Sequence, residues 1–273
     1  MSRSERVILM DGAMGTMLLP HAASADSCLD QFNLTRPALV LEIHKSYLDA
    51  GAHLIVTNTF GANRPRLSLH HQESHLKKIN RAGVRIARKA AGRRPVFASI
   101  GPLGRGAKRM SPAEMHKYFL EQARCLETEE PSGYLIETMM SLGEAEAATI
   151  AVREVSRRLI IASMGLPAGS DRAVGETLEI IASTLRAAGA DILGANCGTH
   201  PEDCYTFLKA LSLVDDGPFC ARPSAGLPNR LMIPEEFSAW GPKFKKLGCR
   251  WIGGCCGTTP AHIRKLRESL SPS

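Results

Sequence analysis

The feature that most constrains the fold is an alternation of short β-rich runs with helical patterns along all 273 residues. Eight runs are expected as strands: 7–10, 54–57, 96–100, 134–136, 159–163, 192–195, 219–222 and 250–252. Each precedes an expected helix: 37–50, 75–91, 112–129, 142–156, 176–188, 201–211, 235–247 and 260–270. Eight strand–helix units without a break in composition favour an α/β fold, a single-domain (β/α)8 TIM barrel over residues 1–273, rather than an open doubly wound sheet.

Composition excludes several other classes of protein. Hydrophobic residues make up 44% and charged residues 22%, which is ordinary for a globular domain, and no apolar run approaches the length of a membrane helix. The N-terminal MSRSERVILMDG has no small-residue cleavage site, so we expect a cytoplasmic protein. The net charge of +7 is spread over separate segments without interleaved aromatic residues. This pattern favours a solvated basic surface over nucleic-acid binding.

A barrel places its active site at the carboxyl ends of its strands, and three of the eight cysteines fall there. Cys197 follows the sixth expected strand, and Cys255 and Cys256 follow the eighth in the stretch GGCCGTTP. Three converging thiolates with no CxxC pair indicate a zinc ion that keeps one position for a substrate. The alternatives for the adjacent pair are small residues that fill a tight loop, or a vicinal disulfide.

The donor set also indicates a reaction type. A zinc ion held by three thiolates is a poor Lewis acid for hydrolysis, but coordination deprotonates a substrate thiol at neutral pH. The resulting thiolate can accept an electrophile such as a methyl group, so we expect S-alkylation of a small thiol. A Schiff-base enzyme is disfavoured because no lysine ends an expected strand.

Other residues at the expected rim are candidates for substrate binding. Glu137 could accept a hydrogen bond from an ammonium group, or pair with a nearby arginine. Asp11 precedes Gly12, where a bare backbone could approach a ligand and offer amide donors to a carboxylate. Asn58 and Asn196 either line the site or tie strand ends together, and the sequence does not separate these roles.

Several motifs of the chain resemble the homocysteine-binding module of the homocysteine S-methyltransferases. They are ILMDGAMGTML, NLTRPALVLEIHKSYLDAGAHLIVTNTFGANR, ASIGPLG, LIETMMSLGEAEAA, GANCG and IGGCCGTTPAHI, and together they span nearly the whole chain. The resemblance implies a (β/α)8 barrel whose zinc ion is held by Cys197, Cys255 and Cys256. It also implies that the sulfur of L-homocysteine is the fourth ligand, and that Glu137 and Asp11 contact the amino-acid end.

Within that family, NLTRP, SYLDAGA and TNTFGANR are most similar to the N-terminal module of cobalamin-dependent methionine synthase. Because the cobalamin-binding DxHxxG pattern is absent, the resemblance implies that methylcobalamin is carried by a separate corrinoid protein or cobalamin domain. The alternatives are a stand-alone enzyme that uses S-methylmethionine or betaine, and a non-catalytic homocysteine-binding subunit. Ser224 and Val56 depart from the family pattern, where Asn and Glu are usual, which puts the geometry around the site in question.

Overall fold

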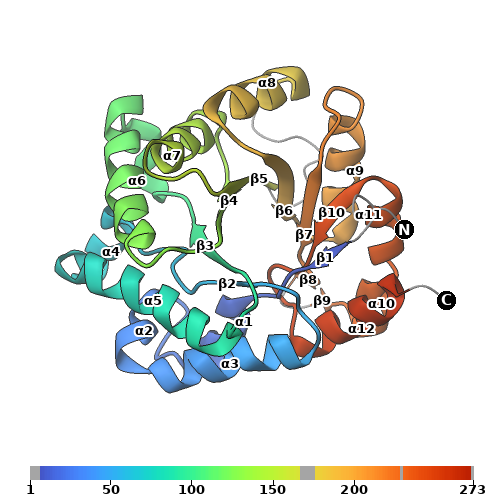
Figure 1. The fold of residues 1–273 in the computed structure, drawn as a ribbon, viewed down its shortest axis with the longest axis horizontal. Coiled ribbons are helices and arrows are strands. Elements are labelled where there is room, and N and C mark those ends of the chain that lie inside the picture. Colours follow the sequence, from blue (N-terminus) through green and yellow to red (C-terminus); the bar gives the residue numbers. More distant parts are fainter. Residues whose placement is uncertain (1–6, 167–175, 228–229, 272–273) are drawn as a thin grey trace.

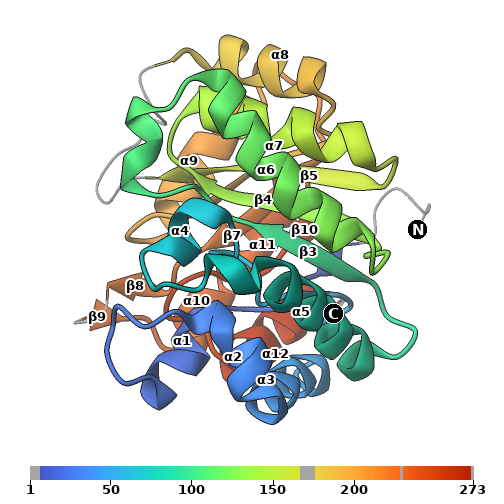
Figure 2. The ribbon, with the colours of Figure 1, turned by 90° about the vertical axis from the view of Figure 1, so that its left-hand side faces the viewer.

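A computed structural model describes residues 7–166, 176–227 and 230–271. The expectation about an N-terminal leader rests largely on residues outside these ranges. Eight parallel strands form one curved sheet that surrounds a central axis, with helices arranged around it (Figures 1 and 2). The prediction of a (β/α)8 barrel is therefore confirmed. No helix within the described ranges is long and apolar enough to cross a membrane.

The strands of the barrel follow the order β1-β10-β7-β6-β5-β4-β3-β2. Their bounds are β1 Ile8–Leu9, β2 Ile55–Val56, β3 Val96–Ile100, β4 Gly133–Met139, β5 Leu159–Leu166, β6 Ile192–Cys197, β7 Phe219–Pro223 and β10 Cys249–Ile252. A small antiparallel hairpin, β8 Gly226–Leu227 and β9 Arg230–Leu231, follows β7. The strands β6, β7 and β10 are thus direct neighbours, so the residues that end β6 and follow β10 lie on either side of the end of β7.

The main helices agree with the expected ones. They are α3 Pro37–Asp49, α5 Leu76–Ala91, α6 Pro112–Glu127, α7 Leu142–Val155, α8 Leu178–Ala188, α9 Pro201–Leu211 and α12 Pro260–Leu270. Additional short helices are α1 Met14–Leu18, α2 Phe32–Thr35 and α4 Arg64–Ser68. The expected helix 235–247 is instead two, α10 Pro234–Ser238 and α11 Gly241–Lys246. Pro242 has no amide hydrogen to continue the first helix, so the chain turns and starts a second.

The barrel closes between its two end strands, β1 and β2. The backbone amide of His53 donates to the carbonyl oxygen of Leu9 at 2.7 Å, and the Leu9 amide donates to Nδ1 of His53 at 3.0 Å. Nearer the carboxyl ends of these two strands, the amide of Val56 donates to Oδ2 of Asp11 at 2.7 Å. A side chain from the loop after β1 therefore helps to close the barrel.

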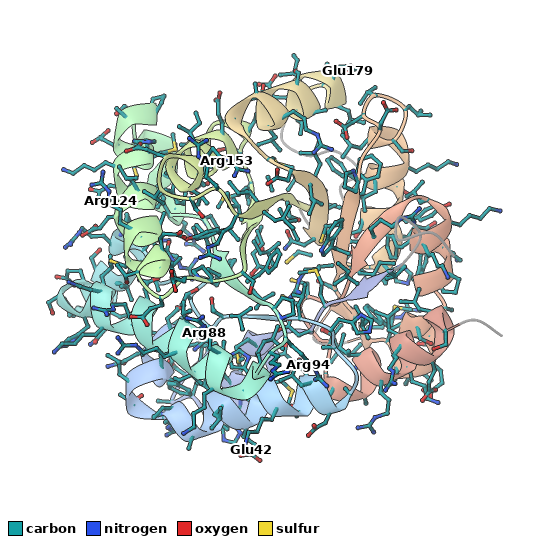
Figure 3. All side chains as sticks on the ribbon, viewed as in Figure 1. Glu42, Arg88, Arg94, Arg124, Arg153 and Glu179 are labelled. Carbon is teal, nitrogen blue, oxygen red and sulfur yellow. The ribbon has the colours of Figure 1, made fainter. Side chains whose placement is uncertain are left out.

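A cluster of apolar side chains fills part of the barrel interior. The buried cluster there comprises Met10, Leu54, Val56, Phe97, Leu135, Ile161, Ile192 and Cys220. Strands alternate their side chains between two faces, so every second residue points to the axis and the others pack against the helices. Figure 3 shows side chains filling the ring, while labelled charged residues such as Glu42, Arg124 and Glu179 lie at its outside.

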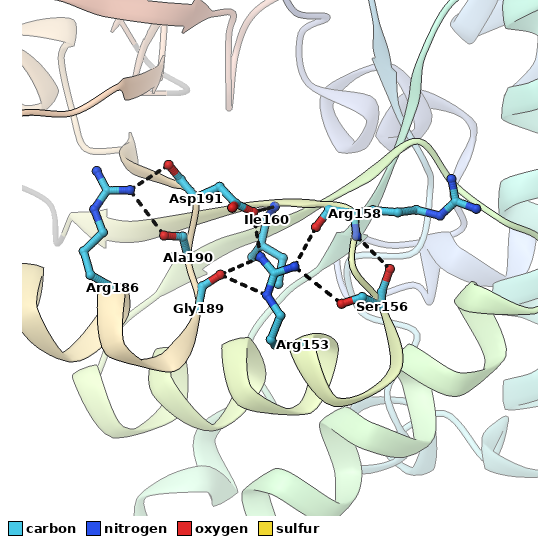
Figure 4. A network of polar contacts seen from close by, with 8 residues as sticks. All are labelled: Arg153, Ser156, Arg158, Ile160, Arg186, Gly189, Ala190 and Asp191. Carbon is cyan, nitrogen blue, oxygen red and sulfur yellow. Dashed lines mark hydrogen bonds and ion pairs between the residues drawn. The ribbon is translucent and has the colours of Figure 1, made fainter.

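The amino ends of the strands are held by arginines that bond to loop carbonyls (Figure 4). Arg153 donates from all three of its nitrogens, to the carbonyl oxygens of Gly189, Ser156 and Arg158 and to the carboxylate of Asp191. Arg186 likewise uses all three nitrogens, on the carbonyls of residues 190 and 191 and on the carboxylate of residue 215. Such fully bonded groups at the amino end of a barrel serve stability.

Candidate active site

Three thiols meet at the carboxyl end of the barrel. Cys197 is the last residue of β6, and Cys255 and Cys256 follow β10. Sγ of Cys197 lies 3.1 Å from Sγ of Cys255, and the three sulfur atoms all lie within 4.8 Å of one another. All eight cysteines are free thiols, so the alternative of a vicinal disulfide does not describe this structure.

The end of β7 holds the three cysteines in place, because β7 lies between β6 and β10. Backbone amides of segment 223–225 donate to the carbonyl oxygens of Cys197 (3.2 Å) and Cys256 (2.8 Å), and its first carbonyl accepts from the amide of Cys255 (2.8 Å). Ser224, which departs from the family pattern, is buried in this segment and supplies the amide that bonds to Cys197. Its backbone role does not depend on the side chain.

Thr258 connects the cysteine loop to the loop after β1. Its hydroxyl donates to the carbonyl oxygen of Cys255 at 2.7 Å and accepts from the amide of Ala13 at 3.1 Å. The hydroxyl of Tyr47, from α3, lies within 3.1 Å of the carbonyl oxygens of both Ala13 and Thr258. A Cβ at Gly254 would lie 2.4 Å from the Thr258 hydroxyl, so the glycine permits this close approach.

The sulfur atoms rest on Asn196, which is fully buried. Its Oδ1 accepts from the amide of Thr138 and from the hydroxyl of Ser163, both at 2.8 Å. Its Nδ2 donates to the Thr138 hydroxyl at 2.7 Å and lies 3.6 Å from Sγ of Cys197. Thr138 and Cys197 have positive φ angles of 61° and 65°, which are uncommon for non-glycine residues and mark functional sites. Asn196 thus both ties strands together and contacts the thiols.

Glu137 points into the barrel from β4 and is buried. One of its carboxylate oxygens accepts from the hydroxyl of Ser99 at 2.6 Å. Burial raises the pKa of Glu137 to about 7, because the charged form loses its hydration. A cation that enters the site therefore stabilises the charged form of this carboxylate.

Asp11 forms a buried ion pair with Arg222, a β7 residue whose role the sequence reasoning missed. Nη1 of Arg222 donates to Oδ1 of Asp11 at 2.9 Å, and the other oxygen of Asp11 accepts from the amide of Val56. Since Cys220 points inward, the two-residue period of β7 also points Arg222 inward, and this period was the available signal. Val56 packs in the interior cluster, where the family pattern usually places a charged Glu.

Asn58 is oriented away from the thiols by its hydrogen bonds. Its side-chain nitrogen donates to the carbonyl oxygen of Leu29 at 2.9 Å and to Oδ1 of Asn33 at 3.1 Å. Asn33 in turn donates to the carbonyl oxygen of Asn58 at 2.6 Å. Asn58 thus has both roles left open by the sequence, because it holds the loop after β2 against segment 29–33 and also lines the cavity beside the thiols.

A cavity of about 360 Å³ connects these groups. It extends from the thiols past Glu137 and the loop after β1 to the chain segments around residues 25–30 and 60–70. Its lining includes Asp11, Gly12, Asn58, Glu137, Arg222, Cys197, Cys255 and Cys256. The sequence-predicted residues therefore surround one space, except Asn196, which lies behind the sulfur atoms.

The thiol groups are electrostatically coupled even without a metal ion. Hydrogen bonds from the thiols of Cys197 and Cys255 hold the pKa of Cys256 well below its usual range, and the same sharing raises the pKa of Cys197. The cluster therefore stabilises a thiolate. Three soft sulfur donors close enough to share one ion fit zinc, which takes tetrahedral sulfur ligands and leaves one corner for a substrate.

Two nearby histidines accept hydrogen bonds at the first turns of helices. Nδ1 of His200 accepts from the amide of Glu202 at 3.3 Å at the start of α9. Nδ1 of His262 accepts from the amide of Thr259 at 3.2 Å, and its Nε2 lies 2.9 Å from the carbonyl oxygen of Met232. Neither imidazole belongs to the cluster of metal-ligand atoms found among the described residues.

Comparison with known proteins now places the chain in a family. Residues 8–270 match the family model described as homocysteine S-methyltransferase. The chain belongs to the homocysteine S-methyltransferase family. In this chain the family motifs noted in the sequence extend past the carboxyl ends of β1, β2, β3, β4, β6 and β10.

Two relatives of this chain are much longer proteins. The chain is 29% identical over 299 residues to methionine synthase of Mycobacterium tuberculosis and 28% identical over 300 residues to that of Mycobacterium leprae. These matches cover 98% of the chain but 25% and 24% of the relatives. The chain thus spans about a quarter of the length of these methionine synthases.

Solved structures confirm the fold. The oxidised form of the homocysteine methyltransferase MmuM from Escherichia coli matches with a TM-score of 0.84 and 24% identity, over 96% of this chain and 95% of that one. The metallated form of MmuM matches with a TM-score of 0.83 and 23% identity, over 97% of this chain and 96% of that one. These likenesses concern the barrel architecture alone.

Proposed function

We propose that this chain binds zinc through Cys197, Cys255 and Cys256 and transfers a methyl group to the thiol of L-homocysteine, which yields methionine. The observation that carries the proposal is the convergence of three thiols within 4.8 Å, at the end of a barrel cavity that also holds buried Glu137. Membership of the homocysteine S-methyltransferase family supports the reaction type. Zinc bound there would lower the pKa of a substrate thiol at its fourth position.

The residues of the cavity would orient the substrate. Glu137 would accept hydrogen bonds from the ammonium group, while Asp11 and Gly12 line the region of the amino-acid end. Asn196, behind the sulfur atoms, would hold the cysteines in position through its bonds to β4 and β5. Fixing a nucleophile near its electrophile in this way removes much of the entropic cost of reaction.

The chemical step is a displacement at carbon. The substrate thiol releases its proton to solvent, and the sulfur lone pair attacks the methyl carbon of the donor. The bond between that carbon and the donor breaks, and its electron pair leaves with the donor. The result is a thioether and a demethylated donor, so no oxidant or reductant is required.

We propose methylcobalamin, carried by a corrinoid protein or a cobalamin domain, as the methyl donor. The relatives of this chain that are named methionine synthase are about four times longer, which supports a donor supplied from outside the barrel. A free small donor such as S-methylmethionine or betaine is the second candidate. The observation behind it is that the homocysteine methyltransferase MmuM is matched along 95% of its length by this barrel alone, without a longer chain.

A donor assay tests the proposal. The zinc-loaded protein is incubated with L-homocysteine and, separately, with methylcobalamin, S-methylmethionine and betaine, and methionine is quantified by mass spectrometry. We expect methionine from methylcobalamin in wild type and none in Cys256→Ala. Methionine from S-methylmethionine or betaine alone would support the second candidate. Binding of homocysteine without methionine from any donor would instead indicate a non-catalytic homocysteine-binding subunit.

A further inference from the structure

Arg222 differs from the arginines that hold the other end of the barrel. It is 4% exposed, and its side chain bonds through Nη1 to Asp11. Its Nε is buried and has no hydrogen-bond partner among the described residues. Arg153 and Arg186, by contrast, use all three nitrogens. A buried unpaired donor is costly, so each such group in a folded protein needs an explanation.

Arg222 lines the cavity, and the unpaired edge of its guanidinium indicates a ligand. Arginine pairs with carboxylates side-on through Nε and Nη2, as Arg186 does with the two oxygens of Asp215 at 3.0 and 2.7 Å. Arg64 pairs with Glu121 through the same two atoms. In Arg222 the ion pair with Asp11 uses Nη1 and leaves that side-on edge to other partners. Because Arg222 lines the cavity beside the thiols, the partner of matching chemistry is a carboxylate that enters the cavity.

The same ion pair limits what Asp11 can do. One oxygen of Asp11 accepts from Arg222 and the other from the amide of Val56, so its charge is already balanced. Burial raises the pKa of Glu137, and the nearby charge of Arg222 offsets part of that rise. Arg222 nevertheless forms its ion pair with Asp11. The hydrogen bond that Glu137 accepts comes from the neutral hydroxyl of Ser99. A substrate ammonium group therefore gains more from Glu137 than from Asp11.

We propose that Arg222 determines specificity for the charged end of the thiol substrate, by binding its carboxylate while keeping Asp11 from binding its ammonium group. This inference rests on the proposed function, because it assumes a thiol whose sulfur lies at the three cysteines. The carboxylate oxygens accept from the guanidinium, and the ammonium group donates to Glu137. Both charged ends of an α-amino acid are then recognised inside one desolvated cavity.

The test compares three thiols that differ only in their charged groups: L-homocysteine, 4-mercaptobutanoic acid without the ammonium group, and 3-aminopropane-1-thiol without the carboxylate. Dissociation constants are measured on the cobalt(II)-loaded protein by the sulfur-to-cobalt charge-transfer absorption, so no turnover is needed. In wild type, loss of the carboxylate should weaken binding roughly 10- to 100-fold, the size of a charge-assisted hydrogen bond.

Arg222→Met, which keeps the length of the side chain, should change the preference. It should weaken homocysteine and 4-mercaptobutanoic acid by about 10- to 100-fold, while 3-aminopropane-1-thiol binds more tightly because Asp11 is released. The matched control is the double variant Asp11→Asn with Arg222→Met, which leaves no unpaired buried charge. It should lose affinity for the two carboxylate-bearing thiols to the same extent, without the gain for the aminothiol.

Two results would overturn the inference. One is an Arg222→Met variant that weakens all three thiols by the same factor, as a general structural defect would. The other is a wild-type protein that binds 3-aminopropane-1-thiol as tightly as homocysteine, which decides the matter even if the variants do not fold. Failure of the proposed function is distinguishable, because it would appear as a cobalt-loaded wild type whose charge-transfer absorption does not change when any of the three thiols is added.

Discussion

The two ends of the barrel use the same residue types in opposite ways. At the amino end, Arg153 and Arg186 saturate their hydrogen bonds on loop carbonyls and on the carboxylates of Asp191 and Asp215. At the carboxyl end, Arg222 keeps a buried nitrogen unpaired and Glu137 is buried with a raised pKa. Fully paired groups contribute stability, whereas groups held without full pairing are available to bind a ligand. Mutations at the two ends should therefore affect different quantities.

The largest effect is expected for Cys255→Ala at the carboxyl end. Loss of one of three thiolates should weaken zinc binding at least about 100-fold, because even residues that only support a metal ligand contribute 10- to 100-fold. Competition with a chelator measures the zinc affinity, and chemical denaturation of the metal-free protein should show little change. Cys125→Ala, at a cysteine of α6 packed near α5, is the matched control and should retain zinc. Full zinc retention in Cys255→Ala would contradict the site.

The reverse pattern is expected for Arg153→Met at the amino end. This change removes bonds to three carbonyls and to Asp191, and should lower the free energy of unfolding by about 2–4 kcal/mol. Zinc and homocysteine affinities should stay within about twofold of wild type, since the site lies at the other end. The exposed neighbour Arg157, changed to Met, provides the control. Loss of ligand affinity without loss of stability would break the comparison between the ends.

A smaller and pH-dependent effect is expected for Glu137→Gln. The substrate thiol releases a proton when it binds, so affinity for homocysteine should fall at lower pH in both proteins. Because burial raises the pKa of Glu137 to about 7, wild-type affinity should fall more steeply below about pH 7 than that of the variant, which should be the weaker binder above this pH. Calorimetric titration between pH 6 and 8 measures both. The same pH dependence in both proteins would argue against an ionised Glu137 as the ammonium partner.

The free energy of unfolding should change with pH in the direction opposite to the affinity for homocysteine. The folded-state pKa of Glu137 lies above its unfolded value of 4.5, so wild type loses stability as the pH rises from 4.5 to about 7. Glu137→Gln removes this loss, and should therefore be the more stable protein at pH 8. Denaturation curves of the metal-free proteins at pH 5 and pH 8 test the sign.

Much of the fold could be predicted because it follows from local patterns. Eight β-rich runs alternating with helices define the barrel, and the rule that sites lie at the carboxyl ends of strands brings Cys197 to the pair at 255 and 256. The same fold also places β7 between β6 and β10. What the pattern could not show is that backbone groups of segment 223–225 bond to all three cysteines, because hydrogen bonds between loops do not follow from local periodicity.

The residues that were missed act through contacts between distant segments. Thr258 and Tyr47 bond to the loop after β1, although Thr258 and Ala13 are 245 positions apart in the chain. Arg222 lies in a strand that is otherwise apolar, and its pairing with Asp11 spans 211 positions. No local periodicity encodes such pairs, so the sequence predicts Asp11 at the rim of the barrel but does not give its partner Arg222.

The central claim is that the three cysteines hold a zinc ion whose fourth ligand is the substrate sulfur. X-ray absorption at the zinc edge, measured on the zinc-loaded protein before and after addition of L-homocysteine, tests it directly. The account predicts three sulfur ligands and one lighter ligand at first, and four sulfur ligands at about 2.3 Å with homocysteine. A sulfur count that does not change when homocysteine binds would contradict it.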